Sequence, residues 1–190
     1  MSWFRRTPLA QARWVVIDCE TSGLDPKRDH LLSVGALKVR QGRIDLAQPF
    51  SSRVRAPSPS PRANILIHGI GGDAQLAAPP REDVLPRLAG FAGEDIAVAY
   101  HAWFDREVLR RAMAPLGLRA PRRWLDLEPL ARDLFPRQRA TSFEHWLGAF
   151  GIEHAGRHDA LLDALAAAEM LLVLLAQAAR QGRRHAEQLL

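Results

Sequence analysis

The sequence contains one cysteine, Cys19, so it has no second thiol for an intramolecular disulfide and too few thiols for a multi-cysteine zinc site. Nothing in the composition requires an oxidising compartment, and we expect the protein in the cytoplasm. Arg5 and Arg6 near the N-terminus are not followed by a long apolar stretch, so a signal peptide is not expected.

Long uninterrupted apolar runs are also missing from the sequence. The most apolar segment, residues 161 to 179, carries Asp163, Glu169 and Gln177, and burying these side chains in lipid would be costly. A membrane span is therefore not expected. No internal repeat is visible either, so repeat architectures are not indicated.

A chain of 190 residues, 47% of them hydrophobic and 25% charged, is long enough and apolar enough for one compact domain with a core. We expect this domain to span residues 14 to 181, between a loose tail of residues 1 to 13 and a loose basic tail of residues 182 to 190. The net charge of +5 favours anionic partners such as nucleic acid. An arginine-rich surface that is only solvated is the alternative.

Three β-rich runs near the start of the chain predict a meander of antiparallel strands. The first run, residues 14 to 17, is followed by the turn-forming residues 21 to 26. Two more runs, residues 31 to 39 and 44 to 54, flank Gln41-Gly42, a pair typical of turns.

The rest of the chain alternates apolar strands with helical patterns. Prolines at 57, 59 and 61 and the segment 77 to 80 predict connecting loops. The predicted strands here are residues 96 to 100 and 124 to 127, and the predicted helices are residues 82 to 92, 105 to 116, 128 to 134, 142 to 150 and 159 to 181. The expected fold class is α/β, with a mixed five-stranded sheet flanked by helices.

Asp18 and Glu20 stand two residues apart at the end of the first predicted strand. Because side chains alternate across a strand, both carboxylates point to the same face, where they can share a metal ion. Cys19 between them points to the other face, and we interpret it as a small buried hydrophobic residue. An acid pair at a strand end is usually only solvated, so this pair alone does not establish a site.

Two further acidic positions follow apolar segments. The predicted strand at residues 96 to 100 leads into a helix that carries Asp105 near its start, where active sites of α/β proteins collect. A simple helix-capping acid, worth ~1 kcal/mol, is the alternative for Asp105. Asp163 lies five residues after His158, and its apolar neighbours favour a buried carboxylate over one on a solvated stripe.

These segments, Asp18-x-Glu20-Thr21, then His101-x-x-Phe104-Asp105, then His158 and Asp163, resemble in order and spacing the motifs of the DEDDh exonucleases, also called DnaQ-like. That family includes the proofreading epsilon subunit of bacterial DNA polymerase III, ribonuclease T and oligoribonuclease. The resemblance spans Trp14 to about Ala176. It implies a ribonuclease H-like sheet with three antiparallel strands followed by parallel ones.

The resemblance implies a role for each matched residue. Asp18, Glu20, Asp105 and Asp163 would be the carboxylates that bind two divalent cations, and His158 would be the general base. Oxygen-only ligands suit Mg²⁺ or Mn²⁺. The implied reaction is hydrolysis from the 3′ end of single-stranded nucleic acid, with release of nucleoside 5′-monophosphates.

Several other positions resemble family segments that contact the terminal nucleotides. We predict substrate-binding roles for a set of seven residues: Thr21, Leu24, His68, Ile70, His101, Trp103 and Phe104. For Leu24 and Ile70, ordinary loop and core roles are the alternative. Asp126 also resembles a recurrent acid of the family, and we predict a structural role for it.

One departure concerns the residue after His101. Many family members have asparagine after the histidine of this motif, whereas this chain has Ala102. A hydrogen-bonding side chain near the substrate is then missing, which bears on the choice between DNA and RNA. Trp103 is a candidate substitute because it can stack on a base.

Three functions remain open at this stage. The first is a DNA exonuclease for proofreading or repair, and proofreading would require a separate DNA polymerase subunit as partner, because the sequence contains no polymerase segment. The second is an exoribonuclease that trims RNA 3′ ends, which a contact to the 2′-hydroxyl would distinguish. The third is a non-catalytic nucleic-acid-binding subunit, which the presence of all five matched residues disfavours.

Overall fold

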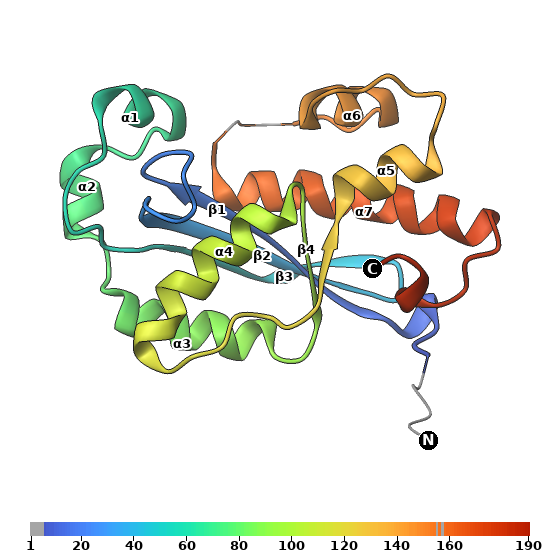
Figure 1. Ribbon diagram of the computed structural model, residues 1–190, viewed down its shortest axis with the longest axis horizontal. Helices are drawn as coiled ribbons and strands as arrows, with labels where there is room; N and C mark the ends of the chain where they lie inside the picture. Colours follow the sequence, from blue (N-terminus) through green and yellow to red (C-terminus); the bar gives the residue numbers. More distant parts are fainter. Residues whose placement is uncertain (1–5, 155, 157) are drawn as a thin grey trace.

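The computed structural model describes residues 6–154, 156 and 158–190, built around a five-stranded sheet with the order β3-β2-β1-β4-β5. The strands are β1 (Arg13–Thr21), β2 (Leu31–Arg40), β3 (Arg43–Arg53), β4 (Ile96–Ala99) and β5 (Trp124–Asp126). The first three pair antiparallel, and β4 and β5 continue the sheet in parallel (Figure 1). The predicted α/β class and mixed sheet are confirmed.

The α-helices cover both faces of this sheet. Those in the described residues are α1 (Arg62–His68), α2 (Gly72–Ala77), α3 (Arg81–Ala92), α4 (Ala102–Met113), α5 (Leu127–Leu134), α6 (Phe143–Phe150) and α7 (Ala160–Arg180). Short 3-10 helices occur at η1 (Leu9–Gln11), η2 (Ala114–Leu116) and η3 (Ala186–Gln188). The predicted positions of α3, α5, α6 and α7 are correct to within a few residues, whereas α4 begins three residues earlier than predicted.

No helix was predicted at α1 and α2, because the prolines on either side of this segment favour connecting loops. Pro61 takes the cap position before α1, and Gly69 after it has φ of 68°, the left-handed conformation that glycine adopts without strain. A proline at the start and a glycine just past the end form a helix signal. That signal was present in the sequence and would have identified α1.

Two apolar cores lie on opposite faces of the sheet, and strand alternation decides which side chain enters which core. Trp14 and Val16 of β1 are buried with residues of α5, α6 and α7. Val15 and Ile17 are buried with residues of α3 and α4 on the other face. Every second residue of β1 therefore faces α7.

The helix α7 is long and apolar enough, at 21 residues, to cross a membrane by length and composition alone. In the fold it packs on β1, β2 and β3 and against α5 and α6. Its small and apolar side chains, among them Ala164, Ala168 and Leu171, are fully buried by these contacts. The helix thus forms part of the core of the domain.

The two ends of the chain are not loose where the structure describes them. The backbone N–H of Leu9 donates to the carbonyl of Arg184 at 2.9 Å, and that of Ala186 donates to the carbonyl of Thr7 at 2.9 Å. Ala186 is fully buried in the core under α7. The expectation of two loose tails is therefore wrong for residues 7–12 and 182–190, because the two segments bind each other.

A close contact between β2 and α7 depends on Gly35. Gly35 pairs with Asp18 in the sheet, and its Cα faces the first turn of α7. A Cβ at this position would lie 2.3 Å from the carbonyl carbon of Ala160 and 2.4 Å from the backbone nitrogen of Leu161. The absence of a side chain thus lets α7 begin directly over the end of β1.

We expect Gly35→Ala to destabilise the protein by about 1–3 kcal/mol, because a buried methyl group without space forces the backbone apart. Gly90→Ala is the matched control, since no heavy atom lies within 4 Å of a Cβ added at this exposed position of α3. Urea denaturation measures both variants. An unfolding free energy of Gly35→Ala equal to that of the wild type would contradict the close contact.

Candidate active site

The end of β1 holds Asp18 and Glu20, beyond the last residue of β1 that pairs with β4. Both residues follow the alternation of Trp14 and Val16, so their side chains lie on the α7 face. The pairing of β1 with β4 ends at Val16, and the two acids follow it along β1. This position is the carboxyl end of two parallel neighbours, where ligand sites of α/β proteins collect.

The start of α7 brings Asp163 to the same place. The side chain of Asp159 caps the helix by accepting the backbone N–H groups of Leu161 at 3.0 Å and Leu162 at 3.1 Å. Asp163 then lies in the first helical turn. Carboxylate oxygens of Asp18, Glu20 and Asp163 lie within 4.8 Å of one another, so the structure brings together three of the four acids that the resemblance implied as metal ligands.

The protonation of this group is strongly perturbed. Burial, followed by the charges of Asp105 and Asp163, raises the pKa of Asp18 well above its usual range. Burial and the charge of Asp163 raise the pKa of Glu20 to about 7. Burial also raises the pKa of Asp163, against the opposing effects of His154 and His158.

A bound cation would relieve this repulsion. Among the described residues, no lysine or arginine forms an ion pair with Asp18, Glu20 or Asp105. Clustered carboxylates without a lysine or arginine partner fit a divalent ion, and an all-oxygen donor set suits Mg²⁺ or Mn²⁺. The residues present therefore fit the metal that the sequence motifs imply.

Asp105 reaches the site from the opposite face of the sheet. It lies in the first turn of α4, is only 4% exposed, and is not part of the group of three. Hydrogen bonds from the thiol and the backbone N–H of Cys19 favour its charged form, but burial outweighs them and raises the pKa of Asp105 to about 7. Cys19 faces α4 as predicted, and its contact with Asp105 is an addition that the sequence analysis missed.

His158 adjoins Asp163 through its backbone. Its N–H donates to Oδ2 of Asp163 at 3.0 Å, and its φ of 62° places it in the left-handed region. Burial, followed by the charge of His158, lowers the pKa of His68 at the end of α1, so the two imidazoles are near each other. His158 is thus near both Asp163 and His68, and its general-base role stays a prediction.

The predicted substrate-binding residues fall into two groups by exposure. Leu24, in the loop after β1, is 89% exposed, and Trp103, in the first turn of α4, is 61% exposed. His101 is half-exposed and its Nε2 lies 3.3 Å from Oε2 of Glu128. These side chains are accessible, so a contact with a nucleotide stays a prediction that their positions allow.

The other group supports the surrounding structure. His68 and Ile70 are only 6% and 7% exposed, and Ile70 packs in a small apolar cluster. Phe104 is partly buried beside α3, and the hydroxyl of Thr21 donates to the carbonyl of Gly23 at 2.6 Å. These contacts give the four residues a structural role in the fold. Their contact with a nucleotide stays a prediction.

The start of α4 buries Ala102 and exposes His101. Ala102 is 3% exposed, so a larger polar side chain there would have no open path to a substrate. His101 has φ of 58°, a conformation that asparagine and histidine adopt more readily than most residues, and it is accessible. The effect of Ala102 on the choice between DNA and RNA stays a prediction.

The carboxylate of Asp126 holds this corner in place. Its Oδ1 accepts the backbone N–H of His101 at 3.1 Å and that of Glu128 at 3.2 Å. It thus joins the end of β4 to the start of α5. This arrangement agrees with the structural role predicted for Asp126.

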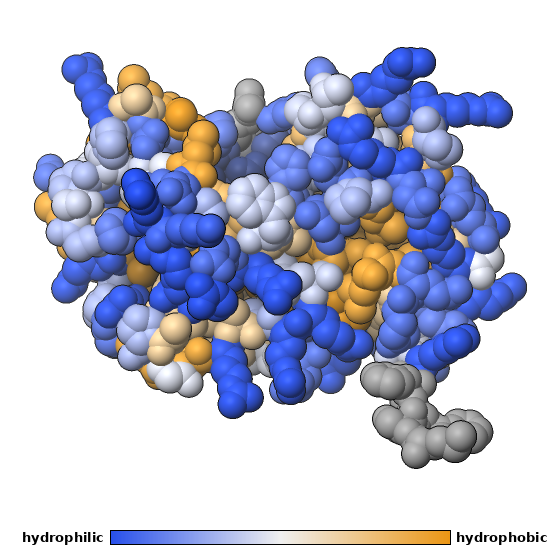
Figure 2. All heavy atoms as spheres, in the orientation of Figure 1, coloured by the Kyte–Doolittle hydropathy of each residue, from blue (hydrophilic) through white to orange (hydrophobic). Residues whose placement is uncertain are grey.

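Two exposed apolar residues that no motif marked lie on α1. Leu66 is 77% exposed and Ile67 is 52% exposed. The side chain of Asn64 donates to the carbonyl of Ser22, which ties α1 to the loop after β1. Figure 2 shows apolar atoms gathered over α1, at the upper left of the view. The site is thus bordered by apolar surface on the α1 side.

Residues 15–171 match the model of the RNase T exonuclease family, and this segment contains all the acidic residues of the site. The chain belongs to this exonuclease family. The site therefore belongs to the class of nucleases, which hydrolyse phosphodiester bonds. The suggested resemblance to DnaQ-like exonucleases is confirmed.

Relatives of this exonuclease domain are replication proteins that are much longer than the chain. A DNA polymerase III subunit epsilon-like protein of Rhodobacter capsulatus is 34% identical over 173 residues, which are 89% of this chain and 24% of the relative. The DNA polymerase III PolC-type of Bacillus subtilis is 32% identical over 184 residues, 95% of this chain and 13% of the relative. The chain thus spans a quarter or less of the length of these two relatives.

Solved exonuclease structures share the fold of this domain. Exonuclease I of E. coli in complex with a dT13 oligonucleotide superimposes with a TM-score of 0.76 at 20% identity, over 90% of this chain and 43% of that one. Exonuclease X in complex with 5′ overhanging duplex DNA gives a TM-score of 0.71 at 27% identity, over 87% of this chain and 93% of that one. The ribonuclease H-like fold is thereby confirmed.

The raised pKa of Glu20 predicts how stability of the metal-free domain depends on pH. In the folded protein the carboxyl group of Glu20 stays protonated up to about pH 7, whereas a free glutamate loses its proton near pH 4.3. The folded state then binds more protons than the unfolded state across this window. The free energy of unfolding should therefore fall as the pH rises, by on the order of 3 kcal/mol for this group.

Urea denaturation in EDTA at pH 5 and pH 8 measures this effect. We expect Glu20→Gln to lose less stability than the wild type over this interval, and Mn²⁺ to restore the wild type at pH 8. Asp73→Asn, at an exposed position of α2, is the control. Equal losses of unfolding free energy in Glu20→Gln and the wild type between pH 5 and pH 8 would contradict the effect of the raised pKa of Glu20.

Proposed function

We propose that this domain is a two-metal-ion 3′–5′ exonuclease that removes nucleoside 5′-monophosphates from the 3′ end of single-stranded DNA. The observation that carries the proposal is the cluster of Asp18, Glu20 and Asp163 within 4.8 Å at the end of β1. Asp105 adjoins it closely enough for its charge to act on Asp18. Membership of the exonuclease family supports the reaction class.

The carboxylates are proposed to hold two Mg²⁺ or Mn²⁺ ions in distinct ways. Asp18, Glu20 and Asp163 would hold one ion together, and Asp18 and Asp105, from opposite faces of the sheet, would hold the second. When bound, the ions supply positive charge for the scissile phosphate and lower the pKa of the attacking water. The acids themselves hold the ions and remain chemically unchanged.

His158 is proposed to take a proton from the attacking water. An imidazole titrates near neutral pH, so a ring nitrogen can accept this proton at physiological pH. The water oxygen forms a bond to phosphorus, and the bond from phosphorus to the 3′ oxygen of the preceding nucleotide breaks. That oxygen gains a proton, which leaves a shortened strand with a new 3′-hydroxyl and a free nucleoside 5′-monophosphate.

The terminal bases are proposed to contact exposed apolar side chains at the border of the site. Leu24 and Trp103 are accessible and come from the two segments that also supply Glu20 and Asp105. An indole can stack on a base of any sequence, which suits an enzyme that removes nucleotides successively. Leu24 would separate neighbouring bases by inserting between them.

DNA is the proposed substrate because of the proteins that this chain is similar to. Its relatives are named as DNA polymerase III components, and the solved structures of similar fold include complexes with DNA oligonucleotides. Either proofreading beside a separate polymerase subunit or repair by the domain alone is compatible with this substrate. RNA trimming remains the alternative that a direct comparison of the two strands decides.

We expect purified protein with Mn²⁺ or Mg²⁺ to shorten 5′-labelled single-stranded DNA from its 3′ end, and Asp163→Ala to lose the activity. Matched RNA strands and EDTA form the parallel reactions, and gel electrophoresis measures the products. Asp73→Ala on α2 is the control because this acid is exposed. Faster loss of RNA than of DNA would favour the exoribonuclease, and no shortening with any metal would leave a binding subunit.

Trp103→Ala should weaken the apparent binding of single-stranded DNA by about tenfold, since stacking on an aromatic ring contributes ~1–3 kcal/mol per base. The apparent affinity for Mn²⁺ should stay unchanged because an indole offers only an N–H donor and no ligand atom for a cation. Trp103→Phe should retain most of the binding. Steady-state KM values for DNA test this, and an unaltered KM in Trp103→Ala argues against stacking.

A further inference from the structure

His154 contacts Asp163, one of the proposed metal ligands. Its Nε2 lies 2.6 Å from Oδ1 of Asp163, and both side chains are shielded, at 13% and 14% exposure. Oδ2 of the same carboxylate accepts the backbone N–H of His158 at 3.0 Å. Each oxygen of Asp163 therefore has one protein partner.

These two contacts restrict the orientation of the Asp163 carboxylate without occupying it. A carboxylate oxygen has two lone-pair sites, so each oxygen with one protein partner retains capacity for a cation. An aspartate side chain without such contacts rotates among several orientations. The carboxylate that these two contacts hold is instead prepared for the same geometry before an ion arrives, which lowers the entropic cost of binding.

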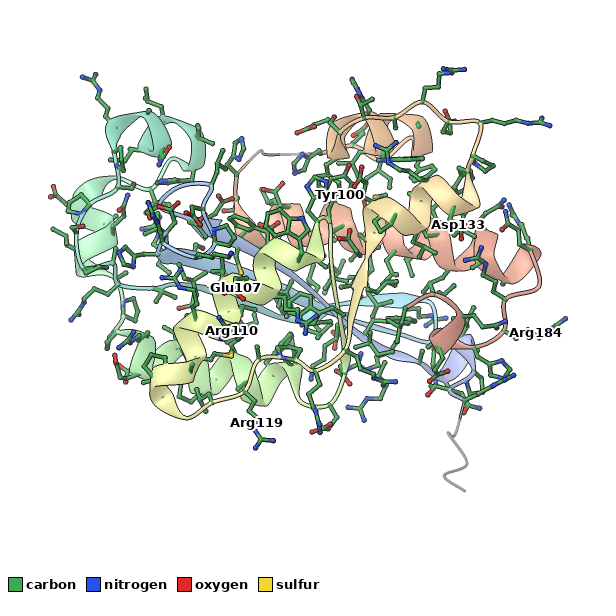
Figure 3. The ribbon with its side chains drawn as sticks, viewed as in Figure 1. Tyr100, Glu107, Arg110, Arg119, Asp133 and Arg184 are labelled. Atoms are coloured by element: carbon green, nitrogen blue, oxygen red, sulfur yellow. The ribbon has the colours of Figure 1, made fainter. Side chains whose placement is uncertain are left out.

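His154 is itself held by a row of aromatic rings. Its imidazole meets the ring of Phe143 on α6 edge-on, with centroids 6.2 Å apart. Phe143 in turn packs on Tyr100, with centroids 4.9 Å apart. Figure 3 shows Tyr100 at the end of β4, below α6. The row thus connects Asp163 on α7 to α6 and to the strand that leads to Asp105.

We propose that His154 is a positioning residue that fixes the Asp163 carboxylate for cation binding through the 2.6 Å contact of its Nε2 with Oδ1. The inference rests on the metal-binding part of the proposed function. His154 would thus orient a metal ligand, a role distinct from the general base proposed for His158. It is supplied by the segment between α6 and α7. The donor atom is the essential feature, and the ring contact with Phe143 serves to place it.

Two substitutions separate the donor from the ring. His154→Phe retains an aromatic ring against Phe143 and removes the Nε2 donor, whereas His154→Gln retains an N–H donor and removes the ring. Mn²⁺ binding to each metal-free protein, without nucleic acid, is measured by electron paramagnetic resonance of the free ion. Loss of a residue that orients a ligand typically costs about 10–100-fold in metal affinity.

We expect His154→Phe to weaken Mn²⁺ binding by about 10–100-fold and His154→Gln to bind within about threefold of the wild type. The control is His145→Phe, at an exposed position of α6. Thermal unfolding of the metal-free variants verifies that each is folded. The reverse order, with normal binding in His154→Phe and weak binding in His154→Gln, would show that only packing matters and overturn the proposal.

The same measurements separate this inference from the proposed nuclease activity. A wild-type protein that binds Mn²⁺ but leaves DNA intact would contradict the nuclease, and the order of the His154 variants would still test the positioning role. A wild-type protein that shortens DNA, with His154→Phe binding Mn²⁺ equally well, overturns the positioning role alone. Equal loss of affinity in both His154 variants likewise overturns it, because a retained donor would then have no effect.

Discussion

Repulsion among carboxylates is the constraint that the site imposes on the rest of this fold. Oxygens of Asp18, Glu20 and Asp163 lie within 4.8 Å of one another, and burial raises the pKa of each group. Such an arrangement opposes folding until protons or cations neutralise it. The two apolar cores must therefore supply the stability that holds β1 and α7 together at this place.

The sheet divides the acids between its two faces. Asp18, Glu20 and Asp163 lie on the α7 face, whereas Asp105 approaches from the α4 face and is held by Cys19. The pairing of β4 with β1 ends at Val16, before the acidic residues. The end of the sheet is thus the place where groups from both faces act on Asp18, and it is suited to a phosphate contacted from two sides.

The predictable part of the site was the part encoded by local periodicity. Asp18 and Glu20 were correctly assigned to one face because strand residues alternate, and Asp163 was correctly placed at the start of the final helix. The thiol contact of Cys19 and the imidazole contact of His154 were not predicted. Each joins segments far apart in the chain or across an irregular loop, for which a single sequence has no periodic signal.

The sequence by itself determined the class of the fold, the order of the chemical motifs and the nuclease family, because alternation, helical spacing and motif order are properties of neighbouring residues. Only the tertiary structure decided that Gly35 lets α7 approach β2, that Asp105 acts on Asp18 from the other face of the sheet, and that the chain ends bind each other. These outcomes depend on distances between elements. Such distances arise from packing of the whole domain, which no local pattern specifies.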